Sequence, residues 1–199
     1  MTVSETQVAR MRDAFRTLNR FMVLLWRLGL GGTMAGRRRG YVMVLVTTGR
    51  KSGQRRLAPL NFAEDPGYIY CLAGFGRRTH WLANLLADPH CEIWLPDGRR
   101  LSGNAELVTD EATRIELIRR LLVRAGFATK LAEPGLDPIL APEAEIAQLG
   151  GRYGRRYEAV RISITGSVGG PGGPGDLRWV LPVAALGAAA TLFVLRRIR

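Results

Sequence analysis

An apolar run of strand length leads directly into a basic turn, and this combination limits the folds open to the chain. Residues Tyr41 to Thr48 are continuously apolar and rich in β-branched side chains, which is typical of a strand buried on both faces. Gly49 to Gln54 has the composition of a turn, and Arg56 to Phe62 is predicted to return as a strand. Pro59 cannot donate to a ladder, so we expect it at an edge or a bulge.

The remaining central region continues this alternation of short strands and turns. Further strands are predicted at Tyr68–Ala73, Glu92–Leu95, Arg100–Val108 and Tyr157–Thr165, and helices at Thr79–Ala87 and Thr109–Arg124, with Thr79 and Thr109 as their N-caps. Ala128 to Gly151 shows no clear periodicity. Because no helices alternate with parallel strands, a doubly wound fold is disfavoured. Residues 41–165 are predicted to form an α+β domain built on an antiparallel sheet or barrel.

The N-terminal region, residues 1–40, is predicted to contain a basic amphipathic helix. Apolar side chains recur at threes and fours between Thr6 and Leu30, with arginines mostly at other positions, and Gly31-Gly32 ends the pattern. Such a helix could lie on a membrane surface or pack on its own domain, and the sequence leaves both possibilities open.

The C-terminal region divides into a Gly/Pro-rich segment and an apolar segment. Residues 166–176 are expected to form a flexible linker, and residues 177–199 a transmembrane anchor. The uncharged stretch Trp179 to Leu195, flanked by arginines, is at the lower limit for a spanning helix, and an interfacial helix is the alternative. The terminal arginines favour a cytoplasmic tail. A short tail crosses more easily than a folded domain, however, so we expect the globular domain to be cytoplasmic.

The composition indicates an anionic partner but excludes a metal centre of the usual kind. The net charge is +12, which suits nucleic acid, anionic lipid or a phosphorylated cofactor. The basic residues are nearly all arginine, as a GC-rich genome would also produce, and no RNA-binding aromatic motif accompanies them. Cys71 and Cys91 lack CxxC spacing and are expected to be small buried hydrophobes in a reducing compartment. With only two histidines, no metal site is expected.

The turn from Gly49 to Arg56 has the chemistry of a phosphate site. Its glycines allow backbone N–H groups to converge on an anion. Ser52 can donate to a phosphate oxygen, Lys51 supplies a point charge, and Arg50 and Arg56 supply bidentate donors. Basic β-turns are often merely solvated. Lysine is rare in this chain, however, so arginine bias does not explain Lys51.

A second group of residues, from Ala73 to Asn84, could border a flat ligand. Gly74 and Gly76 permit close backbone approach, while Phe75 and Trp81 offer apolar surface beside a helix N-terminus. The alternative is structural, with Trp81 anchoring the short helix on the sheet.

These segments together resemble one protein family. VTTGRKSGQRRLAPL, AGFGRRTHWLANLLADP and the following strand pair, spanning Tyr41 to Val108, are similar to the deazaflavin-dependent nitroreductase family. The resemblance implies a split β-barrel of the flavin-reductase type. It also implies an enzyme that transfers hydride from reduced coenzyme F-420 to quinones, nitroaromatics or activated alkenes.

The resemblance also implies roles for individual residues. The expected cofactor-binding residues are Arg50, Lys51, Ser52, Gln54, Arg56, Pro59, Leu60, Gly74, Phe75, Gly76, Arg77, Trp81 and Asn84. Of these, Arg50, Lys51, Ser52 and Arg56 would hold the phosphate and oligoglutamate tail. The tyrosine on the acceptor side, a candidate proton donor, matches Tyr153 or Tyr157. The loop GFGRRTH is shorter than in many relatives, and the C-terminal anchor is an addition to the family pattern.

The expected function is therefore a membrane-anchored coenzyme F-420 reductase acting on a lipophilic acceptor such as a quinone. Two alternatives remain at this stage. One is a split barrel that binds FMN, and the other is a non-enzymatic, tail-anchored module that binds acidic membrane lipid. A homodimer is compatible with all three.

Overall fold

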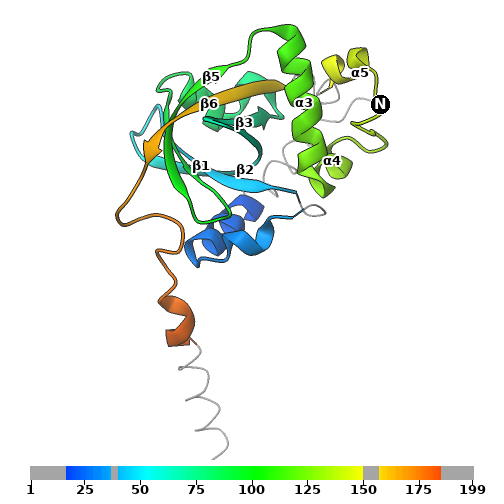
Figure 1. Cartoon of the computed structure of the whole chain (residues 1–199). Coiled ribbons are helices and arrows are strands. Elements are labelled where there is room, and N and C mark those ends of the chain that lie inside the picture. Colours follow the sequence, from blue (N-terminus) through cyan, green and yellow to red (C-terminus); the bar gives the residue numbers. More distant parts are fainter. Residues whose placement is uncertain (1–16, 37–39, 150–156, 185–199) are drawn as a thin grey trace, which may run out of the picture.

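The computed structural model describes residues 17–36, 40–149 and 157–184, and its centre is a closed antiparallel β-barrel. The strand order around the barrel is β1-β2-β3-β6-β5-β4 (Figure 1). The strands are β1 (Val42–Thr48), β2 (Arg55–Asp65), β3 (Tyr68–Ala73), β4 (His90–Trp94), β5 (Arg100–Leu107) and β6 (Glu158–Ser167). The predicted antiparallel barrel is thus confirmed, with each strand within a few residues of its expected bounds.

The first strand is buried on both faces because two different layers cover it. Met43 and Leu45 point into the barrel core, whereas Val44 and Val46 contact Trp26 and Trp94 on the outside. Trp26 belongs to the N-terminal helix, whose described part spans residues 17–27, so this helix packs on its own domain. The continuous apolar run is explained by this double coverage.

The second strand changes partners halfway along its length. Arg55 to Asn61 pair with β1, whereas Phe62 to Asp65 pair with β3. Pro59 therefore lies where β2 has no partner on its β3 side among the described strands, as expected for a residue that lacks an N–H donor. Pro59 and Leu60 thus belong to the part of β2 that is paired with β1 alone.

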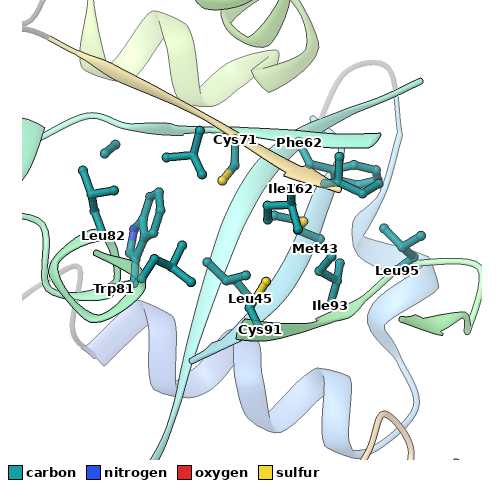
Figure 2. Close-up of a cluster of buried hydrophobic side chains, with 14 residues drawn as sticks. Met43, Leu45, Phe62, Cys71, Trp81, Leu82, Cys91, Ile93, Leu95 and Ile162 are labelled. Carbon is teal, nitrogen blue, oxygen red and sulfur yellow. The ribbon is translucent and has the colours of Figure 1, made fainter. Parts of the chain in front are cut away.

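The barrel interior is filled by aliphatic and aromatic side chains from every strand and from the helix α2 (His80–Leu85) (Figure 2). Trp81 and Leu82 enter this core from α2, which lies between β3 and β4 in the chain. Cys71 and Cys91 are free and buried there, as predicted. Burial raises the pKa of both thiols, that of Cys91 to about 12.

Helices α3 (Glu111–Ala125), α4 (Phe127–Ala132) and α5 (Glu143–Gln148) lie outside the barrel (Figure 1). The N-cap of α3 is Asp110, not Thr109, because the Asp110 carboxylate accepts a hydrogen bond from Thr113 N at 2.9 Å. Helices α4 and α5 occupy the segment without clear periodicity. Each has six residues, too few to display a 3.6-residue pattern.

The C-terminal region departs from the expected flexible linker. Strand β6 continues to Ser167, and the chain after it lies along the barrel and the N-terminal helix. Residues 180–184 are helical, while the remainder of the predicted anchor, from residue 185, is outside the described residues. Within the described ranges, no helix has the length and apolarity needed to cross a bilayer.

Candidate cofactor-binding site

The basic turn between β1 and β2 is closed by its own backbone. Gly49 N donates to Gln54 O at 2.8 Å, and the N–H groups of Ser52 and Gly53 both donate to Gly49 O, at 3.0 and 2.8 Å. A Cβ at Gly49 would stand 2.9 Å from Ser52 Oγ and 3.1 Å from Gln54 O. A side chain at this glycine would therefore displace the Ser52 hydroxyl and crowd the carbonyl of Gln54.

Ser52 organises the opposite side of the turn. Its hydroxyl accepts hydrogen bonds from Arg56 Nη2 at 3.1 Å and from Gln54 N at 3.4 Å. Both contacts use the lone pairs of Oγ, so no described residue takes up the hydroxyl proton. Ser52 can consequently donate to an external anion while it holds Arg56 beside it.

Asn84, on α2, holds the turn through its side-chain amide. Its side chain is 5% exposed, and its Oδ1 accepts hydrogen bonds from both Arg50 N and Arg50 Nη1, each at 3.2 Å. Its Nδ2 donates to Oγ1 of the buried Thr47 at 3.1 Å. Asn84 was expected to shape the pocket. In the structure its side chain holds Arg50 of the turn.

The cations of the turn differ from most other arginines of the protein. Within the described chain, no carboxylate lies at ion-pair distance from Arg50, Lys51 or Arg56. In contrast, ion pairs with Asp or Glu engage Arg27, Arg55, Arg77, Arg99, Arg100, Arg114, Arg120 and Arg161. The uncompensated charge at the turn is suited to an anionic group such as a phosphate.

The loop after β3 contributes a glycine turn and an unsatisfied hydroxyl. Gly76 is buried with φ of 58°, a conformation that favours glycine, and it begins the short 3-10 turn η2 (Gly76–Arg78). Thr79 occupies the N-cap position of α2, but its side chain makes no capping hydrogen bond. Its Oγ1 is buried and has no partner among the described residues. A polar ligand atom here would satisfy this hydroxyl.

The residues expected to face the flat part of the cofactor lie in two different environments. Pro59 and Leu60 are partly buried in the part of β2 that pairs with β1 on one edge and has no described strand on the other. Trp81 is 8% exposed and packs in the barrel core (Figure 2). This agrees with the alternative interpretation of the sequence, in which Trp81 anchors the short helix on the sheet. Its contribution to the site is the placement of α2, and thereby of Asn84.

Tyr157 lies beside the glycine loop, whereas Tyr153 is outside the described residues. The Tyr157 ring is close to Gly74, whose Cβ, if added, would stand 3.7 Å from it. The phenol is buried and donates to Glu133 Oε1 at 2.6 Å. No sequence pattern indicated that Tyr157 would pair with a glutamate, because Glu133 lies in the segment without clear periodicity.

A hollow of about 230 Å³ opens next to Tyr157. It is lined by Arg77, Leu107, Val108, Thr109, Glu111, Arg114, Tyr157 and Glu158. Its charges are paired, Arg77 with Glu158 and Arg114 with Glu111, at 3.4 and 2.7 Å. This hollow therefore lacks the uncompensated positive charge of the turn, and the two features are chemically distinct.

Comparison with known proteins assigns the chain to a family. The family model described as F420H(2)-dependent quinone reductase matches residues 20–129, which include the turn, the glycine loop and α2. Similar solved structures include an F420 reductase (18% identity over 66% of this chain and 92% of the other, TM-score 0.43). An F420-H2 dependent reductase, FDR-A, is 25% identical over 61% of this chain and 93% of that chain, with a TM-score of 0.41.

A putative pyridoxamine 5'-phosphate oxidase from Listeria innocua is a further match (14% identity over 64% and 86% of the two chains, TM-score 0.44). The unpaired cations of the turn and the unsatisfied hydroxyl of Thr79 fit a phosphate-bearing cofactor. That cofactor is coenzyme F-420, as the resemblance predicted. The chain belongs to the F420H(2)-dependent quinone reductase family and is a coenzyme F-420-dependent reductase.

Proposed function

We propose that this reductase transfers hydride from reduced coenzyme F-420 to a lipophilic acceptor, a quinone or a nitroaromatic compound, at a membrane. The observation that carries the proposal is the combination of two neighbouring features: a cationic turn held by Asn84, in which Arg50, Lys51 and Arg56 have no described carboxylate partner, and the edge of residues 55–61 of β2 that faces away from β1 and has no described strand partner. The first feature suits the anionic tail of the cofactor, and the second leaves backbone groups available to its ring.

The residues of the turn would hold the phosphate and oligoglutamate tail. Arg50, Lys51 and Arg56 would neutralise its charge, while the free proton of Ser52 would be donated to a phosphate oxygen. When bound, the deazaflavin supplies the hydride chemistry, and the protein supplies binding and orientation. The backbone at Pro59 and Leu60, together with the glycine loop, would orient the ring and exclude water from it.

Proton delivery to the reduced acceptor is proposed to come from the tyrosine side of the site. Tyr157 lies against Gly74 and shares a hydrogen bond with Glu133, so its phenol is held in a fixed position. Tyr153 is the other candidate suggested by the resemblance. Either residue would act by contacting the acceptor or by donating a proton to it.

A membrane location would bring the site to acceptors that dissolve in lipid. The apolar stretch Trp179 to Leu195, bordered by arginines, supports a C-terminal anchor with the globular domain in the cytoplasm. The buried, unpaired thiols of Cys71 and Cys91 are compatible with that reducing compartment.

The test uses the purified full-length protein in detergent. Reduced coenzyme F-420 is titrated in while its fluorescence and absorbance are followed, and the complex is then mixed with menadione or with a nitroaromatic. We expect tight binding and rapid reoxidation by menadione, with weak binding of FMN in a parallel titration. Tight binding without reoxidation by either acceptor would rule out the proposed acceptor class.

A further inference from the structure

We propose that the N-terminal helix and the start of the C-terminal helix form one surface that docks on an anionic lipid bilayer. The segment 168–178, here termed the strap, holds the two together on the barrel. The inference rests on the proposed membrane location. It identifies the face of the domain that contacts the lipid. It also states that the connection to the anchor is fixed on the barrel and not flexible.

The strap is attached to the barrel through its backbone. Arg100 Nη1 donates to the carbonyl oxygens of Gly169, Gly170 and Pro171, at 3.3, 2.9 and 3.3 Å, and Arg55 Nη1 donates to Gly172 O at 3.1 Å. Glu92 holds both arginines, since its carboxylate accepts from Arg55 at 3.0 Å and from Arg100. A glycine- and proline-rich segment bound at this many carbonyls does not behave as a free linker.

The strap is also bound to the end of the N-terminal helix. Gly175 N donates to Trp26 O at 2.9 Å, and Leu177 N donates to Arg27 O at 2.8 Å. Arg27 completes the contact through hydrogen bonds to Asp176, at 2.8 Å for Nη2 and 3.1 Å for Nε. The C-terminal helix consequently starts beside the N-terminal helix (Figure 1).

The N-terminal helix has apolar side chains on the face that the barrel does not cover. Trp26 is 1% exposed, whereas Leu18, Phe21 and Leu24 are 49%, 56% and 44% exposed. At about 100° per residue, Phe21 and Leu24 lie on the opposite side of the helix from Trp26. Large apolar side chains exposed in a row on a helix indicate a contact surface for an apolar partner.

The beginning of the C-terminal helix has the same character. Trp179, Leu181 and Val183 are exposed, and the sequence remains uncharged as far as Leu195. Because the strap joins this segment to the N-terminal helix, insertion of one into a bilayer would bring the other to the lipid surface.

The charges around this surface favour an anionic bilayer. The described part of the N-terminal region, residues 17–36, contains no acidic residue, and none occurs after Asp176. Asp176 itself is neutralised by Arg27. The exposed Arg20 and the arginines that flank the apolar stretch would attract anionic headgroups while the apolar side chains enter the interface.

The test places an environment-sensitive fluorophore on the surface of the full-length protein. Phe21→Cys supplies the attachment point, and the native thiols are buried and poorly ionised, so labelling is selective. Glu116→Cys, at an exposed position on α3, is the matched control. On addition of phosphatidylcholine vesicles containing phosphatidylglycerol, we expect a blue shift at position 21 and none at position 116.

A second comparison tests the strap. Arg27→Ala and Asp176→Asn each remove the ion pair while retaining the C-terminal apolar segment. Both variants should remain bound to vesicles in a flotation assay but show a reduced shift at position 21, with cofactor affinity unchanged.

Three results would overturn the inference. A label at position 21 that remains in water on vesicle-bound protein would refute the surface while leaving the anchor in place. Failure to bind vesicles would refute both the docking surface and the anchor. The assignment of the cofactor would be unaffected, because cofactor binding is titrated separately. A blue shift that needs no vesicles and grows with protein concentration would identify a second copy of the chain as the partner.

Discussion

The side-chain oxygen of Asn84 lies 3.2 Å from both the backbone nitrogen and a guanidinium nitrogen of Arg50, although the two residues are far apart in the sequence. A single buried amide thus fixes the backbone of the turn and the direction of one of its cations. The candidate binding site is therefore assembled from two elements, the turn between β1 and β2 and the helix α2. Removing either partner should affect the same property, affinity for the cofactor.

Asn84→Ala should weaken cofactor binding through Arg50 and also destabilise the protein. The substitution leaves Thr47 Oγ1 and Arg50 N without their buried partner, which costs about 1–3 kcal/mol of unfolding free energy. We expect a lower Tm and a raised Kd for coenzyme F-420, measured by thermal melting and fluorescence titration. Asn104→Ala, at an exposed position on β5, is the control and should change neither quantity. A normal Kd for the Asn84 variant would show that the turn orders itself without this amide.

Lys51→Ala should weaken cofactor binding without affecting the fold. Loss of one charge-assisted hydrogen bond, about 1.5–3 kcal/mol, corresponds to a roughly 10- to 100-fold increase in Kd. The side chain has no acidic partner in the described structure, so Tm should stay within about 2 °C, since exposed substitutions change stability little. Lys130→Ala removes the other lysine, which is exposed on α4, and provides the charge-matched control. Equal affinities of the two variants would argue against the turn as the phosphate site.

Gly103→Ala should destabilise the barrel, whereas Gly166→Ala should be close to neutral. A Cβ at Gly103 would stand 2.6 Å from Ile162 Cγ2 and 2.8 Å from the backbone oxygen of Ser163, and the backbone atom cannot move away freely. Overpacking of this kind costs about 1–3 kcal/mol. A Cβ at Gly166, on the paired strand, meets only Ser102 Oγ at 3.5 Å. Urea unfolding of both variants measures the difference, and equal midpoints would contradict this account of the β5–β6 contact.

The stability of the protein should decrease as the pH falls through the low pKa of Glu92. Burial alone would raise this pKa, but hydrogen bonds from Arg100 and Trp94 and the charges of Arg100 and Arg55 lower it below the ordinary value of 4.5. A carboxyl whose pKa is lower in the folded state contributes stability above the unfolded pKa, and this contribution is lost as the pH falls through the folded pKa. The Tm should therefore drop below about pH 4.5.

The comparison for this pH dependence is Glu92→Gln. The variant should have a lower Tm at neutral pH and a smaller decrease on acidification, because the titrating carboxylate is gone. Glu145→Gln, at an exposed position on α5, should retain the behaviour of the native protein. A Tm profile of Glu92→Gln that parallels the native profile would assign the acid sensitivity to other carboxyls.

Features that depend on neighbouring residues could be predicted from the sequence. The apolar run of β1 required burial on both faces, and Gly49 to Arg56 contained the glycines, hydroxyl and cations of the anion site in consecutive positions. The turn motif, combined with the downstream segment that contains Trp81 and Asn84, resembles the family that the comparison confirmed. Local composition and short-range spacing determine these features, because the groups concerned are adjacent in the chain.

The free charges and the contacts of the glycine-rich segment became evident in the folded structure alone. Most arginines look alike in the sequence, but partners such as Glu92 and Asp176 neutralise many of them, whereas Arg50, Lys51 and Arg56 have no described carboxylate partner. The side chains of the strap do not indicate its contacts, because it accepts hydrogen bonds through backbone carbonyl oxygens from Arg55 and Arg100, which lie on distant strands. The support of the turn by Asn84 and the exposure of Phe21 opposite Trp26 likewise depend on packing between elements. Such long-range pairs arise when the barrel closes, so no local pattern specifies them.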